Sequence, residues 1–179
     1  GRIARALVEH TQDIAGRVTC AHRAGFGQHG RPQVGAARHR CDLLRAVVAG
    51  VGHYLPERIV ENAEFEKTLD TNDEWIRARS GIERRHFASE NETTSFMATA
   101  AAKAALNDAG LSAQDVDAII LATSTADLTF PSAATMVQAQ LGMKSGFAFD
   151  VQAVCAGFVY ALSNANAMII SGQAKRVLV

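Results

Sequence analysis

The sequence predicts an α/β fold with a mostly parallel sheet, because short apolar segments alternate with longer segments of helix-forming residues. The apolar segments are rich in Val, Ile, Leu and Ala, which is typical of buried strands. The longer segments have ten or more residues, enough for the helix of a right-handed β-α-β crossover. Four strands are expected, at residues 45–52, 117–124, 146–154 and 175–179.

Capping residues and glycines set the expected boundaries of the helices. In the first part of the chain, helices are expected from Asn62 as cap to residue 70, from a capping box at residues 71–74 to Gly81, and from Thr93 or Thr94 to Gly110. In the second part, helices are expected from Pro131 to Gly142 and from Cys155 to Gly172. Residues 83–87 are predicted to form a strand or hairpin arm, and residues 112–115 a capping-type turn.

Composition excludes several classes of protein. The chain has 179 residues, 48% hydrophobic and 20% charged, with a formal net charge of zero, so no nucleic-acid partner is expected. No apolar run reaches the roughly 18 residues needed to span a bilayer, so no membrane partner is expected. The three cysteines (Cys20, Cys41 and Cys155) are too few and scattered for a disulfide framework or a metal site. A cytoplasmic location is the default expectation.

The first 44 residues differ from the rest. They hold seven Arg, no Lys and three acidic residues, and their apolar residues follow no sustained helical or strand period. We expect residues 1–44 to be an unstructured or non-native leader with the natural start near Leu44, and a basic arm that binds an anionic partner is the alternative. Residues 45–179 are expected to form the folded domain.

Cys155 is the strongest candidate for a chemical role. It lies where an apolar strand meets a predicted helix, so its thiol faces unpaired backbone N–H groups and the positive end of the helix dipole, which favour the thiolate. Ala153 and Gly157 keep the positions two residues away small, as a sharp strand-to-helix turn at a nucleophile requires. The alternative is a small buried core residue, because a nucleophilic thiol needs a base or orienting His, and only His53 and His86 lie beyond residue 44.

The segment DVQAVCAGF around Cys155 resembles the nucleophile segment of the β-ketoacyl-acyl-carrier-protein synthase III family. The segments GVGHYLPERIVEN, TNDEWIRARSGIERRHF, DVDAIILATST and FPSAATMVQAQLG are similar to family segments in the same order. The resemblance covers residues 45–179 and not residues 1–44. It implies a thiolase-like fold, of which this chain is the amino-terminal half of a layered α-β-α-β-α architecture, truncated before the second half.

The resemblance also implies an acyltransferase of fatty-acid biosynthesis. In that family a cysteine takes an acetyl or other acyl group from coenzyme A and condenses it with malonyl-acyl carrier protein, releasing CO₂. Cys155 corresponds to that nucleophile, and the coenzyme A thioester is a substrate, so no separate cofactor is implied. The family enzyme is a homodimer.

Four other residues match family positions. Trp75 corresponds to a residue that stacks on the adenine of coenzyme A, Arg79 to a coenzyme A contact and Thr71 to a nucleotide contact. Phe130 corresponds to a residue that walls the acyl pocket across the dimer interface. For Trp75 the alternative is a core anchor, for Arg79 a surface ion pair with Glu83 or Glu74, and for Thr71 a helix cap.

The catalytic His and Asn of the family lie in its second half and have no counterpart here, so the chain alone is expected to be inactive in condensation and poorly soluble. Two other functions stay open. One is a related condensing enzyme that uses a different acyl-CoA starter. The other is a non-catalytic acyl-CoA-binding fragment.

Overall fold

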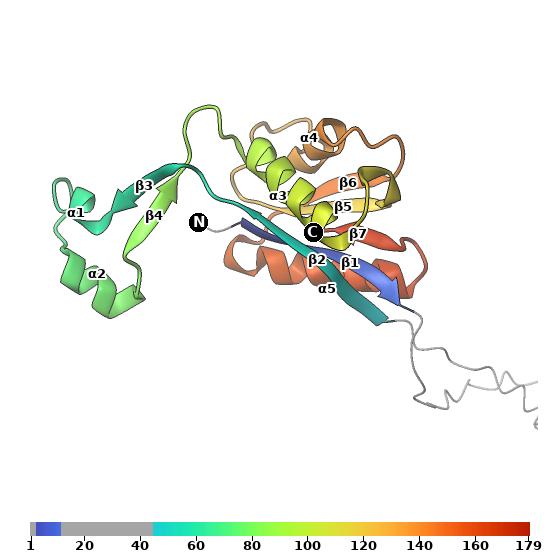
Figure 1. Ribbon diagram of the computed structural model, residues 1–179, viewed down its shortest axis with the longest axis horizontal. Helices are drawn as coiled ribbons and strands as arrows, with labels where there is room; N and C mark the ends of the chain where they lie inside the picture. The colour runs from blue at the N-terminus through green and yellow to red at the C-terminus, as the bar shows by residue number, and fades with distance from the viewer. Residues whose placement is uncertain (1–2, 12–44) are drawn as a thin grey trace, which may run out of the picture.

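The computed structural model describes residues 3–11 and 45–179, which form a five-stranded sheet with helices on both faces and a smaller two-stranded arm (Figure 1). The strand order of the large sheet is β2-β1-β7-β5-β6. Its strands are β1 (Ile3–Thr11), β2 (Arg45–Tyr54), β5 (Ala118–Ala122), β6 (Phe147–Val151) and β7 (Arg176–Leu178). The predicted α/β class and all four predicted strands are confirmed.

The strand directions confirm the mostly parallel sheet. β5 pairs in parallel with β6 on one side and with β7 on the other. β1 is antiparallel to both of its neighbours, β2 and β7, so β2 runs in the same direction as β7. Within the described sheet, β1 alone runs against the other strands.

We expected residues 1–44 to be an unstructured or non-native leader, and β1 corrects the first of these two alternatives for residues 3–11. Residues 3–11 pair along their whole length with β2, and three of them also pair with β7. Pairing of this kind uses backbone N–H and C=O groups, so a segment without a side-chain period can still complete a sheet when two strands offer open edges. The rest of the predicted leader, with Cys20 and Cys41, lies outside the described residues.

The sheet separates two apolar layers. On one face α3 (Thr94–Ala109) and α4 (Ala133–Gln140) pack over Ile119, Leu121 and Leu178. On the other face α5 (Gly157–Ile170) packs over Ile120 and Val177 (Figure 1). Successive residues of β5 therefore serve opposite layers, as the pleat requires, and both faces of this strand are buried.

Two glycines of β2 allow α3 to approach the sheet closely. A Cβ atom on Gly52 would lie 2.2 Å from the backbone nitrogen of Ala105, and one on Gly50 would lie 2.6 Å from the carbonyl oxygen of the same residue. The facing side of α3 is built from alanines, which leave little space between helix and strand. The fit therefore depends on the absence of a side chain at both glycines.

Most predicted helix boundaries are confirmed. The Thr93 side chain accepts a hydrogen bond from the backbone N–H of Phe96 at the start of α3, and Gly110 ends that helix with φ of 66°. Ser112 and Asp115 form a capping box at the short 3₁₀ helix η1 (Ala113–Asp115). Gly172 follows α5 with φ of 76°.

Three helices in this part of the fold begin at other residues than predicted, and at two of them a neighbouring polar side chain supplies the cap. Ser132 caps α4, so Pro131 precedes the helix, after a cis peptide bond with Phe130. Asn72 rather than Thr71 caps α2 (Asp73–Ser80), since its side chain accepts from the N–H of Trp75 at 2.8 Å. Asn62 is the first residue of α1 (Asn62–Phe65), and its side chain bonds elsewhere.

A small unit, here called the arm and defined as residues 58–87, extends from the large sheet and its helices, here called the body (Figure 1). It consists of β3 (Arg58–Glu61), α1, α2 and β4 (Arg84–Phe87), with β3 antiparallel to β4. This confirms the predicted hairpin arm at residues 83–87.

Among the described helices, none combines the length and the apolarity that a membrane crossing requires.

We expect Gly52→Ala to lower the free energy of unfolding by about 3 kcal/mol, because overpacking against helix backbone leaves no side chain that can give way. Urea unfolding followed by far-UV circular dichroism measures this loss. Gly172→Ala is the matched control. Its Cβ would meet nothing within 4 Å, so only the left-handed backbone opposes it, at about 1 kcal/mol. Equal losses in the two variants would contradict the close packing of β2 on α3.

Candidate active site

Cys155 lies beyond the carboxyl end of β6, in a single 3₁₀ turn, η2 (Val154–Ala156), that leads into α5. The Ala156 N–H donates to the carbonyl oxygen of Ala153 at 3.0 Å and closes this turn. The predicted strand-to-helix corner is therefore confirmed, although α5 itself begins at Gly157. Cys155 is exposed in this chain, so the described residues do not bury it as the alternative of a core cysteine requires.

Val154 holds the corner in an unusual backbone conformation. Its φ is 45°, and among the described residues it is the one non-glycine with positive φ. A β-branched residue in this region is strained, and its side chain is 76% exposed, so packing of that side chain compensates little. Strain of this kind is found at functional sites, where it aims a neighbouring group.

Gly157 confirms the requirement for a small residue after the cysteine. A Cβ atom at this position would lie 3.1 Å from the Cβ of Ala122, the last residue of β5. The first turn of α5 thus rests directly on the end of the neighbouring strand. The corner around Cys155 is fixed by this contact as well as by its hydrogen bond.

Phe130 belongs to the same end of the sheet. It lies in the loop that follows β5, and its side chain is 88% exposed. Because β5 and β6 are parallel neighbours, the loops that follow them leave the sheet at the same edge, where α/β proteins bind ligands. The structure therefore brings Phe130 and Cys155 to one edge.

Asp150 joins these two loops and was missed by the sequence reasoning. Its carboxylate accepts hydrogen bonds from the N–H groups of Ala133 (2.8 Å) and Ala134 (2.7 Å), at the start of α4. A residue of β6 thus fixes the helix that follows the Phe130 loop. The signal in the sequence was an acid inside an otherwise apolar strand, five residues before the cysteine.

Trp75 and Arg79 lie together on α2, in the arm. Trp75 is 56% exposed, whereas the next residue, Ile76, is buried, so Ile76 rather than Trp75 is the core anchor of this helix. The Arg79 guanidinium carbon lies 5.5 Å from the centroid of the Trp75 ring, a cation–π contact. The ion pair with Glu83 is made by Arg77, at 2.8 Å.

Thr71 lies just before α2, and its hydroxyl is the one buried side-chain polar atom among the described residues that lacks a hydrogen-bond partner. Its predicted alternative role as a helix cap is taken by Asn72. Thr71, Trp75 and Arg79 all lie on the arm, whereas Cys155 and Phe130 lie at the carboxyl end of β5 and β6.

Asn62 organises the arm and was also missed. It is buried and donates from Nδ2 to Asp73 (2.8 Å) and to the carbonyl oxygen of Ile82 (2.8 Å), while its Oδ1 accepts from Arg85 (2.7 Å). These bonds tie α1 to both ends of α2 and to β4.

Within residues 3–11 and 45–179, no cluster of His, Cys, Asp and Glu suited to a metal ion occurs.

Comparison with known proteins gives consistent results. A family described as 3-oxoacyl-[acyl-carrier-protein (ACP)] synthase III matches residues 149–179, the segment that contains Cys155. A β-ketoacyl-[acyl-carrier-protein] synthase III of Roseobacter denitrificans is 83% identical over 136 residues, which are 76% of this chain and 42% of that relative. One from Rhodobacter capsulatus is 76% identical over the same shares. The chain thus spans less than half the length of these relatives.

Solved structures agree in fold. The 3-oxoacyl-[acyl-carrier-protein] synthase III of Aquifex aeolicus matches with a TM-score of 0.70 and 52% identity, over 72% of this chain and 42% of that one. A priming β-ketosynthase of the R1128 polyketide pathway matches with a TM-score of 0.68 and 36% identity, over 70% of this chain and 38% of that one. The thiolase-like fold expected from the sequence is confirmed.

The arm is expected to loosen in acid through Asp73. Hydrogen bonds from Asn62 and then Arg77 lower the pKa of Asp73 below its usual value of 3.8. A lowered pKa means that Asp73 stabilises the fold fully above about pH 4 and loses this effect as the pH falls through the lowered value. Trp75 emission in the wild-type chain should therefore change below pH 4, and Asp73→Asn, which keeps the shape without titrating, should flatten that change. An identical acid titration of the two proteins would contradict this.

Proposed function

We propose that Cys155 is a nucleophile that accepts the acyl group of a coenzyme A thioester. The proposal is supported by the similarity of this chain to part of the β-ketoacyl-[acyl-carrier-protein] synthase III sequences. The observation that carries the proposal is the exposed thiol on a strained turn at the carboxyl edge of β6. A buried thiol in a relaxed helix would have no such access. Coenzyme A takes part as substrate, and no separate cofactor is required.

In the proposed step the Cys155 sulfur attacks the carbonyl carbon of the acyl-CoA, and a carbon–sulfur bond forms. Negative charge develops on the carbonyl oxygen, where N–H groups of a first helical turn can stabilise it. The bond to the coenzyme A sulfur then breaks, its electron pair leaves with that sulfur, and the proton of the Cys155 thiol ends on free coenzyme A. The product is a thioester on Cys155.

The arm supplies the proposed coenzyme A contacts. The Trp75 ring is exposed and is proposed to stack on a purine. Arg79 lies over the same ring, and its guanidinium is suited to bind phosphate oxygens. Thr71, whose buried hydroxyl lacks a hydrogen-bond partner among the described residues, is the third proposed contact. Phe130, exposed at the same edge as Cys155, is the proposed wall of the acyl pocket at a homodimer interface.

For the whole protein we propose condensation of the acyl group with malonyl-acyl carrier protein, with loss of CO₂, as the initiating step of fatty-acid synthesis in the cytoplasm. That step needs a His and an Asn that stabilise negative charge. His86 is not suited, since its Nδ1 donates to the carbonyl oxygen of Pro56, beside the arm. The step of the reaction that we assign to the described residues is therefore acyl transfer to Cys155. We propose that the chain alone lacks condensation activity.

A different starter is the second candidate, favoured by the 36% identity to a priming β-ketosynthase. Acyl-CoA thioesters of increasing chain length, offered in competition, separate the two candidates by which acyl group accumulates on Cys155. A fragment that binds acyl-CoA without acylation would instead be a non-catalytic binding module.

Incubation with acetyl-CoA should place one acetyl group on Cys155, detected by peptide mass spectrometry, and should protect this thiol from iodoacetamide. Cys155→Ser should not be modified. Cys20 and Cys41 of the same chain are internal controls and should label at the same rate with and without acetyl-CoA. Cys155 labelling no faster than in the urea-unfolded chain, without acetylation, would refute the assignment.

Trp75→Ala should weaken coenzyme A binding by about 5- to 100-fold, the effect of one lost base–aromatic stack. Trp75→Phe keeps a ring and should lose less. Isothermal titration calorimetry measures both affinities. Equal affinity of Trp75→Ala and wild type would exclude Trp75 from the binding site.

A further inference from the structure

The arm is joined to the body by two crossings of the chain. The first, residues 55–57, follows β2, and the second, residues 88–93, leads to α3. Among the described residues, no hydrogen bond or ion pair links residues 58–87 to the large sheet or to its helices. The direction in which the arm points therefore depends on contacts made at the crossings.

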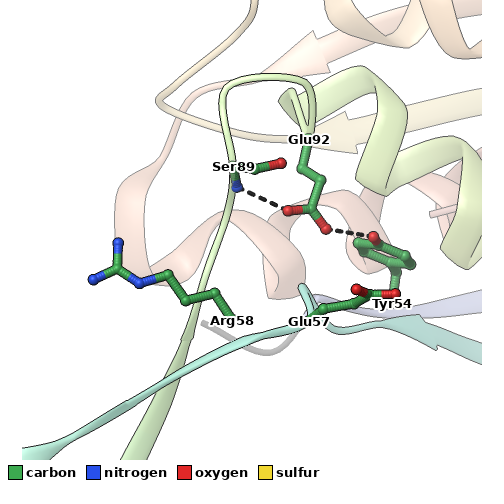
Figure 2. A pocket seen from close by; sticks show the side chains of 5 residues that line it. All are labelled: Tyr54, Glu57, Arg58, Ser89 and Glu92. Atoms are coloured by element: carbon green, nitrogen blue, oxygen red, sulfur yellow. Dashed lines mark hydrogen bonds between the residues drawn. The ribbon is translucent and has the colours of Figure 1, made fainter.

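Glu92 connects the second crossing to the end of β2, where the first crossing begins. The Tyr54 hydroxyl, at the end of β2, donates to Oε1 of Glu92, and the backbone N–H of Ser89 donates to Oε2 at 2.8 Å (Figure 2). Both oxygens of one carboxylate are thus engaged, one by the last residue of β2 and one by a backbone N–H within the second crossing. We call the Tyr54–Glu92 hydrogen bond the latch.

The latch is anchored in the body. The Tyr54 ring packs edge-to-face against the ring of Phe96 in α3, with centroids 5.7 Å apart. At the other end of the crossings, His86 Nδ1 donates to the carbonyl oxygen of Pro56 at 2.6 Å. These two links, one near the body and one near the arm, make a closed frame of the two crossings. The latch hydrogen bond between Tyr54 and Glu92 raises the pKa of Tyr54 and lowers the pKa of Glu92.

The hollow beside the latch, about 580 Å³, is lined by Tyr54, Glu57, Arg58, Ser89 and Glu92 (Figure 2). Each oxygen of its central carboxylate already accepts a hydrogen bond from the chain itself. The hollow is better explained as the space enclosed where the crossings leave the body. Three of its lining residues, Tyr54, Ser89 and Glu92, hydrogen-bond to one another and link the end of β2 to the second crossing.

We propose that Tyr54 and Glu92 are positioning residues that fix the direction of the arm relative to the sheet edge that carries Cys155. The consequence for acyl transfer rests on the proposed function, since coenzyme A would contact the arm through Trp75 and reach Cys155 on the body. The latch acts together with the His86–Pro56 hydrogen bond, and it is the link of the two that lies nearer the large sheet.

Trp75 is the single tryptophan of the chain, so its fluorescence reports on the arm. In the 179-residue chain, Tyr54→Phe removes the latch hydroxyl and keeps the ring against Phe96. We expect the fraction of Trp75 anisotropy lost on the nanosecond timescale to rise at least about two-fold. Glu57→Gln, which removes a charge from the same hollow and leaves both groups of the latch hydrogen bond in place, should match wild type. Unchanged anisotropy in Tyr54→Phe would overturn the proposal whether or not Cys155 is acylated.

The second measurement is the rate of Cys155 acylation against acetyl-CoA concentration. Tyr54→Phe should raise the half-saturating concentration by about three- to ten-fold, the effect of one lost hydrogen bond, with the maximal rate within about two-fold. Iodoacetamide labelling of Cys155 without acetyl-CoA should not change, which separates positioning from general damage. A looser arm with an unchanged half-saturating concentration would overturn the positioning role. A wild-type chain that is never acylated would instead refute the proposed function and leave the anisotropy result to decide the latch.

Discussion

Parallel pairing of β5 with β6 is the constraint on which the candidate site depends. It brings the loops after both strands to one edge, so the Phe130 loop and the Cys155 corner become neighbours in space. Asp150 of β6 also fixes the start of α4, because its carboxylate accepts two hydrogen bonds from backbone N–H groups there. The apolar layers on both faces of β5 hold the pair in register, since a slip by one residue would exchange the two layers.

Small residues set the distances around this sheet. Gly52 lets α3 lie against β2, and Gly157 lets α5 begin on the end of β5. The strained Val154 lies between β6 and α5, in the single 3₁₀ turn that contains Cys155. The close contacts of the neighbouring elements hold this strained conformation, whose cost is of the order of 1–3 kcal/mol.

The arm is held by different forces. Its buried apolar side chains are few, chiefly Val60 and Ile76, so the polar network of Asn62 has a large share in its order. Cation–π contacts of Arg58 with Phe87 and of Arg85 with Phe65 add to it. A unit of this kind keeps its own shape but needs a link such as the latch to keep its direction.

The sequence by itself determined the α/β class, the four main strands, the caps at Thr93 and Gly110 and the corner at Cys155, because each rests on residues adjacent in the chain. Tertiary structure alone decided where distant groups meet. β1 joins the sheet through backbone bonds to β2 and β7, Asp150 reaches the N–H groups of α4, and Tyr54 reaches Glu92. These partners lie 16 or more residues apart and leave no local pattern, since a hydrogen bond across the fold depends on how the backbone brings two segments together.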